Sequence, residues 1–178
     1  GELVKAYPKD VDAAVLYAES RMDLRPWGLF SSDGTAAPGT VEIIATLEGA
    51  LRASPDHPGA CHYYIHAVEA SLQPERALAC AERLPALMPG AGHLVHMPAH
   101  TYIRVGRYDD SVKANEHAAH TDEQFITDRN PSDAYPFTYY PHNLHFLWIA
   151  SAIEGRSKEA IEAARKLSAH LPDSVVRK

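Results

Sequence analysis

Histidine is the residue type in this sequence whose number and spacing could do chemistry. The chain has 178 residues and 11 histidines, against 4 Phe, 3 Met and 2 Trp. Imidazole titrates near neutral pH and is a favoured ligand of zinc, copper, nickel and ferrous iron. Most of the histidines fall in three short motifs: His57-Pro58-Gly59-Ala60-Cys61-His62-Tyr63-Tyr64-Ile65-His66, His93-Leu94-Val95-His96-Met97-Pro98-Ala99-His100 and His142-Asn143-Leu144-His145. These motifs point to metal binding or acid–base chemistry.

The elements that carry the motifs are predicted to be helices. Long stretches rich in Ala, Leu, Glu and Arg are separated by Pro and Gly, and no run of alternating β-branched residues indicates a strand. Two predicted helices close on Pro55 and Pro89, which are 34 residues apart. The sequence therefore predicts an all-α chain with an internal repeat of this length.

The predicted turns between helices agree with such a repeat. The turn Gly106-Arg107-Tyr108 returns as Gly155-Arg156-Ser157, 49 residues later, and the connection over residues 128–136 is rich in Pro, Asn and Asp, so it can hold the 15 extra residues. We expect one domain over residues 1–178, in which an irregular first repeat (1–56) precedes repeats near 58–91, 92–125 and 141–174. The irregular repeat is expected to contain helices near residues 10–24 and 41–53, and the last repeat is expected to end at Pro172.

From His57 to Pro172 the sequence resembles the tetratricopeptide-repeat (TPR) family. The three histidine motifs resemble more narrowly a bacterial subgroup of that family with no settled activity. The resemblance implies an α-solenoid of about four TPR-like helix pairs, and suggests that the chain is a fragment of a longer protein to which other repeats could contribute. It supplies no reaction.

Most of the motif histidines share one face of their helices. Counted from the start of each repeat, they occupy positions 2, 5 and 9, which fall within an arc of about 60° on an α-helix. The TPR resemblance implies that these positions line the concave groove. Adjacent helices pack about 8–10 Å apart, a gap that imidazoles from two helices can bridge around one ion.

The leading hypothesis is a transition metal site (Zn, Cu, Fe or Ni) in the groove. In it, His62 and His66 chelate from one helix, with the Glu69 carboxylate as a further donor, while His96, His100 and His145 complete the coordination. The motifs place seven histidines at these positions, which is more than the four ligands of one tetrahedral ion. Either two ions bind, or some of the histidines act in proton transfer or hold the ligands in place. Pro98 is expected either to kink its helix or to begin it. The predicted metal-ligand set is His62, His66, Glu69, His93, His96, His100, His142 and His145.

Other side chains are expected to line or frame the groove. Tyr139 and Tyr140, beside Pro141 in the expected loop, and Arg104 are candidates for contacting a small molecule or peptide. Four further histidines are expected to be structural: His57, His117, His120 and His170.

Several functions stay open at this point. A metal-dependent hydrolase or oxidoreductase of unassigned substrate is one. The rival is a TPR adaptor that binds a peptide or protein partner without metal. A metal-free His/Glu groove for acid–base chemistry or anion binding, a purely structural histidine cluster and a structural segment of a larger enzyme are further alternatives.

Composition argues against other classes of protein. Lys plus Arg total 17 against 23 for Asp plus Glu, a formal charge of −6 without a basic run, so nucleic acid is not an expected partner. No apolar stretch approaches the roughly 20 residues of a membrane span, and Gly1-Glu2-Leu3-Val4-Lys5 is unlike a secretory signal. The two cysteines, Cys61 and Cys80, are expected to be buried thiols. The compartment is left unassigned.

Overall fold

The computed structural model describes residues 1–131 and 134–171, and these residues form helices joined by turns and loops. No strand occurs among them, and one isolated bridge pairs Phe30 with Ala36. By contacts, the chain divides into two compact units, Gly1–Leu87 and Met88–Lys178. The boundary lies close to the predicted junction of the second and third repeats.

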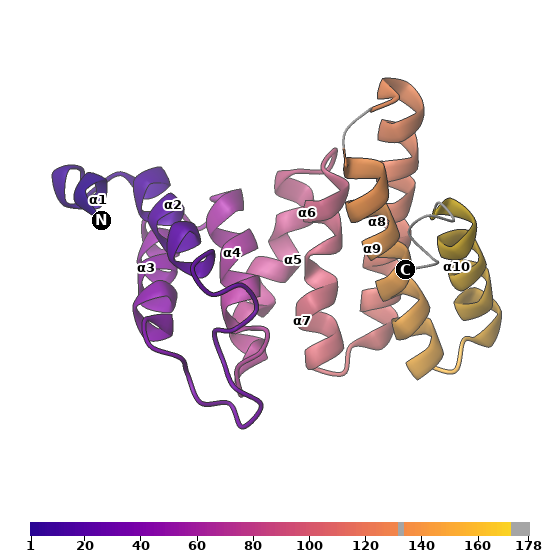
Figure 1. The fold of residues 1–178 in the computed structure, drawn as a ribbon, viewed down its shortest axis with the longest axis horizontal. Helices are drawn as coiled ribbons and strands as arrows, with labels where there is room; N and C mark the ends of the chain where they lie inside the picture. The colour runs from indigo at the N-terminus through magenta and orange to yellow at the C-terminus, as the bar shows by residue number, and fades with distance from the viewer. Residues whose placement is uncertain (132–133, 172–178) are drawn as a thin grey trace. The chain divides into compact units, whose positions relative to one another are not determined.

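The first unit carries the first histidine motif on a helix that packs between two others. Its core includes Val15, Ala50 and Ala60, contributed by α2, α3 and α4. In Figure 1, α2, α3 and α4 lie side by side, and these three helices contact one another while α4 also contacts α5. The helices of this unit are α1 (Glu2–Ala6), α2 (Val11–Met22), α3 (Thr40–Ala53), α4 (Pro58–Val68), the 3₁₀ helix η1 (Pro74–Ala77) and α5 (Leu78–Leu87).

Local sequence explains where α4 begins. Pro58 occupies the first turn, where its missing N–H costs no hydrogen bond. His57 caps the helix because its Nδ1 accepts from the Ala60 N–H at 3.1 Å, and its Nε2 lies 2.9 Å from Asp12 Oδ1 on α2. The expected structural role of His57 is confirmed by these contacts.

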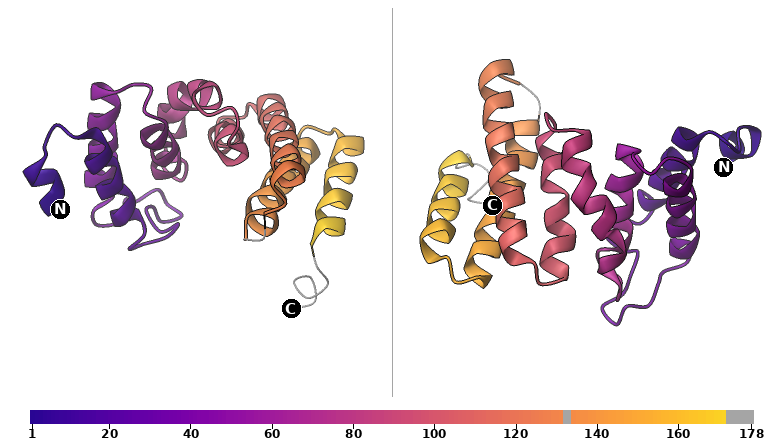
Figure 2. Two further views of the ribbon diagram at one scale, coloured as in Figure 1. Left: turned by 90° about the horizontal axis from the view of Figure 1, so that it is seen from above. Right: turned by 180° about the vertical axis from the view of Figure 1, so that it is seen from behind.

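The second unit places the other two motifs on helices that share the long helix α8 as a neighbour. Helix α8 contacts α6, α7 and α9, and α9 contacts α10 (Figures 1 and 2). Ala119, Tyr140 and Leu144 form a core cluster between α8 and α9. The helices of this unit are α6 (Gly92–His96), α7 (Pro98–Arg104), α8 (Tyr108–Arg129), α9 (Tyr135–Ile153) and α10 (Ser157–His170).

The repeated Gly-Arg turns are the same structure twice. Gly106 and Gly155 end α7 and α9 with φ of 78° each, a left-handed conformation that glycine adopts without strain. The N–H of the following arginine then donates backwards at 2.9 Å, from Arg107 to the Tyr102 oxygen and from Arg156 to the Ser151 oxygen. This is the Schellman pattern of helix ends. The turns predicted from the repeated Gly-Arg are confirmed.

Of the two expectations for Pro98, the second is confirmed, because Pro98 separates α6 from α7 and stands at the first position of α7. The start of α9 differs from the prediction. Helix α9 begins at Tyr135, six residues before Pro141, and runs through that proline. It packs against both α8 and α10. Tyr139 and Tyr140 therefore lie within a helix, and the prediction of a loop there is wrong. The predicted end of the last repeat, from Pro172 to residue 174, lies outside the described residues.

Among the helices that the structure describes, none has the length and apolar character that a membrane crossing requires.

Gly92, at the start of α6, is the glycine with the tightest surroundings. A Cβ at this position would lie 1.8 Å from Asp122 Oδ1 and 2.5 Å from its Cγ. We expect Gly92→Ala to lower the free energy of unfolding of the second unit by about 1–3 kcal/mol, because α6 or Asp122 must move. Urea unfolding followed by Trp148 fluorescence measures this, since Trp148 lies on α9 and Trp27 of the first unit is 94% exposed.

The matched control is Gly90→Ala, two residues earlier. Nothing lies within 4 Å of a Cβ at Gly90. This variant is expected to keep the wild-type midpoint or to exceed it slightly. Equal destabilisation by both substitutions would contradict the tight contact between Gly92 and Asp122.

Candidate metal centre

Three histidines of the second unit converge from three helices. His96 ends α6, His100 lies in α7 and His142 lies in α9. Each offers one ligand nitrogen, and the three nitrogens all lie within 4.8 Å of one another. The ring centroids of His96 lie 4.8 Å from His100 and 4.7 Å from His142. We call His96, His100 and His142 the histidine trio.

The break at Pro98 leaves His96 and His100 one helical turn apart. Met97, between the two helices, keeps helical dihedrals with φ of −49° and ψ of −35°. Its N–H donates to the His93 oxygen, and the His100 N–H donates to the Met97 oxygen. The four-residue spacing therefore still places the two imidazoles on the same side.

His96 is held by a hydrogen bond to α8. Its imidazole is 0% exposed, and Nδ1 lies 2.6 Å from Oδ1 of Asn115, which is also 0% exposed. Asn115 Nδ2 donates to the backbone oxygen of Ser111 at 2.7 Å, one turn earlier on α8, and this leaves Oδ1 as the acceptor for His96. His96 Nδ1 is thus the protonated nitrogen, and Nε2 carries the lone pair.

The free lone pair of His96 is buried. Among the described residues, Nε2 has no hydrogen-bond partner. Burial lowers the pKa of His96 well below its usual value, and the neighbouring His100 and His142 lower it further, while the bond to Asn115 opposes the shift. A neutral imidazole with an available nitrogen is the form that binds metals.

An aromatic ring covers the histidine trio. Phe146, one turn after His142 on α9, has its ring centroid 4.7 Å from that of His96, 4.6 Å from that of His100 and 4.9 Å from that of His142. An apolar neighbour of this kind limits water access and strengthens electrostatic interactions at the site.

A second buried polar contact fixes α9, which carries His142. Asp122 of α8 is 0% exposed and accepts hydrogen bonds from Asn143 Nδ2 at 2.7 Å and from the Tyr135 hydroxyl at 2.6 Å. Burial raises the pKa of Asp122, and the two hydrogen bonds oppose that shift. Because Asn143 follows His142 directly, this contact sets the position of α9 against α8 at the histidine trio.

The other predicted residues of the second unit lie around the trio or apart from it. His93 stacks on His96 at 5.9 Å and contacts Tyr139 at 4.7 Å between ring centroids. His145 is exposed and its ring contacts Trp148, so the structure does not bring it into the trio. Arg104 is exposed at the end of α7, one turn after His100. Tyr140 is 7% exposed, and its hydroxyl donates to Glu123 Oε1.

The predicted ligands of the first unit lie together on α4 and at its end. The rings of His62 and His66 are 5.1 Å apart, and His66 Nδ1 lies 2.9 Å from Glu69 Oε1. The sequence also predicts that His96, His100 and His145 bind the same ion as this set. Those residues belong to the other unit, and this part of the hypothesis stays a prediction.

The histidines expected to be structural in the second unit lie away from the trio. His170 Nε2 donates to the Pro136 oxygen at 2.6 Å and so ties α10 to the start of α9. His117 and His120 are exposed on α8, where His120 contacts Gln124.

Sequence reasoning missed the residues that hold the trio in place. Asn115, Asp122 and Phe146 lie outside the positions selected by repeat number. A signal for one of them existed, because an asparagine in mid-helix is unfavourable unless its side chain has a partner, and Ser111 lies one turn earlier.

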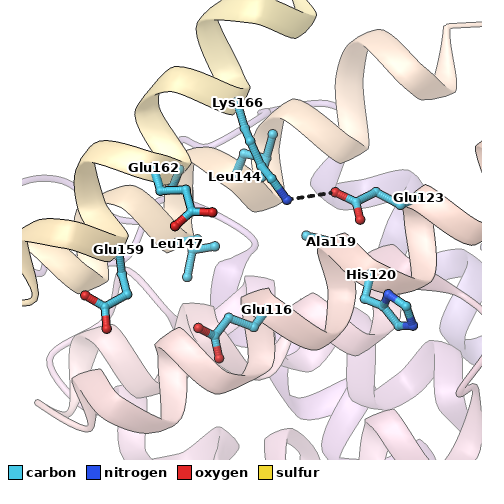
Figure 3. A pocket seen from close by; sticks show the side chains of 10 residues that line it. Glu116, Ala119, His120, Glu123, Leu144, Leu147, Glu159, Glu162 and Lys166 are labelled. Carbon is cyan, nitrogen blue, oxygen red and sulfur yellow. Dashed lines mark hydrogen bonds and ion pairs between the residues drawn. The ribbon is translucent and has the colours of Figure 1, made fainter.

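The second unit also has an open pocket of about 270 Å³ between α8, α9 and α10 (Figure 3). Leu144 and Leu147 of α9 form part of its wall, and Glu116, Glu159 and Glu162 lie around it. Lys166 of α10 pairs with Glu123 of α8 at 3.2 Å. None of the three histidines of the trio lines this pocket.

Comparison with solved structures identifies the fold. The crystal structure of MamA, a TPR-containing protein, matches with a TM-score of 0.66 at 16% sequence identity, covering 95% of this chain and 82% of MamA. The fold is TPR-like. The prediction of an all-α, TPR-like fold of the α-solenoid class is therefore confirmed. No family model and no curated protein matches the sequence, and the assignment to a histidine-rich bacterial subgroup stays a prediction.

The support that α8 gives to α9 can be tested by removing the Asp122 carboxylate. Asp122→Ala leaves the Tyr135 hydroxyl and Asn143 Nδ2 without their acceptor, so the free energy of unfolding of the second unit should fall by about 2–4 kcal/mol. Asp128→Ala is the matched control, because Asp128 is exposed on the same helix. Urea unfolding measures both, and a wild-type midpoint for Asp122→Ala would refute the supporting role.

Proposed function

We propose that this chain is a TPR-like protein that binds one transition metal ion through His96, His100 and His142. The observation that carries the proposal is His96 Nε2, a fully buried lone pair without a hydrogen-bond partner among the described residues, with ligand nitrogens of two other histidines within 4.8 Å. Buried polar atoms in folded proteins are nearly always paired. A metal ion would give this nitrogen a partner.

The spacing of the trio is compatible with one ion after small side-chain rotations. Imidazole nitrogens bound to tetrahedral zinc at about 2.0–2.1 Å lie about 3.3 Å from one another. The three nitrogens, at up to 4.8 Å, need to approach by roughly 1 Å or somewhat more. Rotation about the side-chain bonds of His142, which is only partly buried, can supply such a movement.

Three imidazoles leave a coordination position for water or substrate. Catalytic zinc sites use three protein ligands in this way, and imidazole also suits copper, iron and nickel. Zn, Cu, Fe or Ni is thus the proposed cofactor, and a metal-dependent hydrolase or oxidoreductase is the class of enzyme that such a site would serve. His93, which stacks on His96, and Tyr139, whose ring lies tilted against that of His93, would line the approach to the metal.

Substitution of the trio tests the metal proposal directly. His96→Asn removes Nε2 and keeps an amide donor where Nδ1 contacts Asn115. We expect this change, and likewise His100→Asn and His142→Asn, to raise the Kd for Zn²⁺ more than about tenfold, since loss of residues that merely orient ligands already costs 10–100-fold. Competition with a chromophoric chelator measures the Kd.

The control is His117→Asn, which replaces an exposed histidine on α8. It should bind Zn²⁺ with wild-type affinity. If all four variants bind equally well, the ion does not lie at the trio. If the wild-type chain binds none of Zn²⁺, Co²⁺, Ni²⁺ and Cu²⁺ after purification without chelator, the chain has no transition metal site of this kind.

A protein-interaction adaptor is the second candidate function. It is supported by the TPR-like fold and by two exposed side chains of the second unit, Tyr139 (41% exposed) on α9 and Arg104 at the end of α7. The partner would be a peptide, held by stacking on the tyrosine and by a charged contact with the arginine, without metal.

Peptides selected from a displayed library on chelator-treated protein test the adaptor. Tyr139→Ala and Arg104→Ala should each weaken the selected peptides several-fold in fluorescence anisotropy, whereas Tyr7→Ala, at a tyrosine 59% exposed in the first unit, should not. Selection of no peptide, or equal binding by all variants, would count against this function.

A further inference from the structure

The residue that contacts His96 from α8 has a specific task if the metal proposal holds. We infer that Asn115 is a positioning residue that fixes His96 as an Nε2 donor, and that the trio thereby takes borderline divalent ions such as Zn²⁺ and Co²⁺ in preference to Mg²⁺ and Ca²⁺. The inference rests on the proposed function and adds to it the tautomer of His96, the residue that sets this tautomer and the discrimination against Mg²⁺ and Ca²⁺.

The orientation of the Asn115 amide follows from its two contacts. Nδ2 donates to the Ser111 backbone oxygen at 2.7 Å, and Oδ1 lies 2.6 Å from His96 Nδ1. Exchanging the two amide atoms would place Oδ1 against the Ser111 oxygen, and two acceptors would face each other. His96 must therefore donate from Nδ1, and its lone pair is on Nε2.

The amide is also fixed in place. Asn115 and Ser111 are both 0% exposed, and the anchoring oxygen belongs to the backbone of α8 one turn before Asn115. A support built on a helix holds a ligand more accurately than one built on a loop. In the other tautomer, His96 Nε2 would carry a hydrogen at the point where an ion must bind.

The chemistry of the donors decides the class of ion. All three ligand atoms of the trio are imidazole nitrogens. Mg²⁺ and Ca²⁺ prefer oxygen ligands, whereas imidazole suits the ions of zinc, cobalt, nickel and copper. An imidazole whose Nδ1 donates to Asn115 already has its lone pair on Nε2, so it binds such an ion there without a change of tautomer.

The tautomer can be observed without any metal. Long-range ¹H–¹⁵N NMR of the full chain, labelled with ¹⁵N-histidine and treated with chelator, is expected to show His96 protonated at Nδ1. Asn115→Leu, which cannot accept a hydrogen bond, should shift His96 toward protonation at Nε2. Asn115→Asp keeps an acceptor and should restore the Nδ1-protonated form. Ser111→Ala is the control, because it retains the backbone oxygen that orients the amide.

Metal titration of the same proteins completes the test. Asn115→Leu should raise the Kd for Zn²⁺ by 10–100-fold, Asn115→Asp should bind at least as tightly as the wild type, and Mg²⁺ and Ca²⁺ should not displace Zn²⁺ at millimolar concentration. In Co²⁺-loaded protein, the visible d–d bands should change in Asn115→Leu and persist in Ser111→Ala.

The outcomes separate this inference from the proposed function. A wild-type chain that binds no Zn²⁺ overturns both. Wild-type binding together with an unchanged Kd and unchanged Co²⁺ spectrum in Asn115→Leu overturns the positioning role alone. If Asn115→Leu does not fold, the wild-type NMR spectrum decides, since protonation of His96 at Nε2 in the metal-free chain contradicts the inference by itself.

Discussion

The hydrogen bond from His96 Nδ1 to Asn115 Oδ1 links the candidate metal centre to the helical framework. It joins two fully buried side chains on α6 and α8 at 2.6 Å, and it determines which nitrogen of His96 is available. His100 and Phe146 matter to the candidate site because their rings lie against the imidazole of His96. Inside a protein, a polar contact of this kind is strong when both partners are satisfied and costly when one is not. His96 Nε2 has no hydrogen-bond partner among the described residues, and a bound ligand is the best explanation for this.

Helix α8 supplies the buried polar contacts on which both histidine-bearing segments depend. Ser111, Asn115 and Asp122 are spaced by four and seven residues, so they lie along one face of the helix. Asn115 contacts α6, and Asp122 contacts Asn143 and Tyr135 of α9. In some proteins, buried polar contacts between helices fix the alignment of those helices. In this protein, the contacts of Asn115 and Asp122 position the histidine-bearing helices α6 and α9 against α8.

The sequence predicts the helical class and the Gly-Arg turns, and its larger predicted ligand set includes the three histidines of the trio, because each leaves a local or periodic signal. Gly106 and Gly155 mark helix ends by a conformation that glycine favours, and the spacing of His96 and His100 survives the break at Pro98. The start of α9 could not be predicted, since tertiary contacts with α8 and α10 override the signals of Pro136 and Pro141. Asn115 and Phe146 were missed for a related reason. Their roles come from contacts between segments far apart in the chain, and a repeat count selects only equivalent positions.

X-ray absorption spectroscopy of the zinc-loaded chain tests the central claim most directly, because it reports the atoms around the ion. We expect one Zn²⁺ per chain with three nitrogen neighbours at about 2.0 Å and the multiple-scattering pattern of imidazole, and one fewer imidazole in His96→Asn. A shell made of oxygen atoms alone, or an imidazole count that His96→Asn leaves unchanged, would contradict the account.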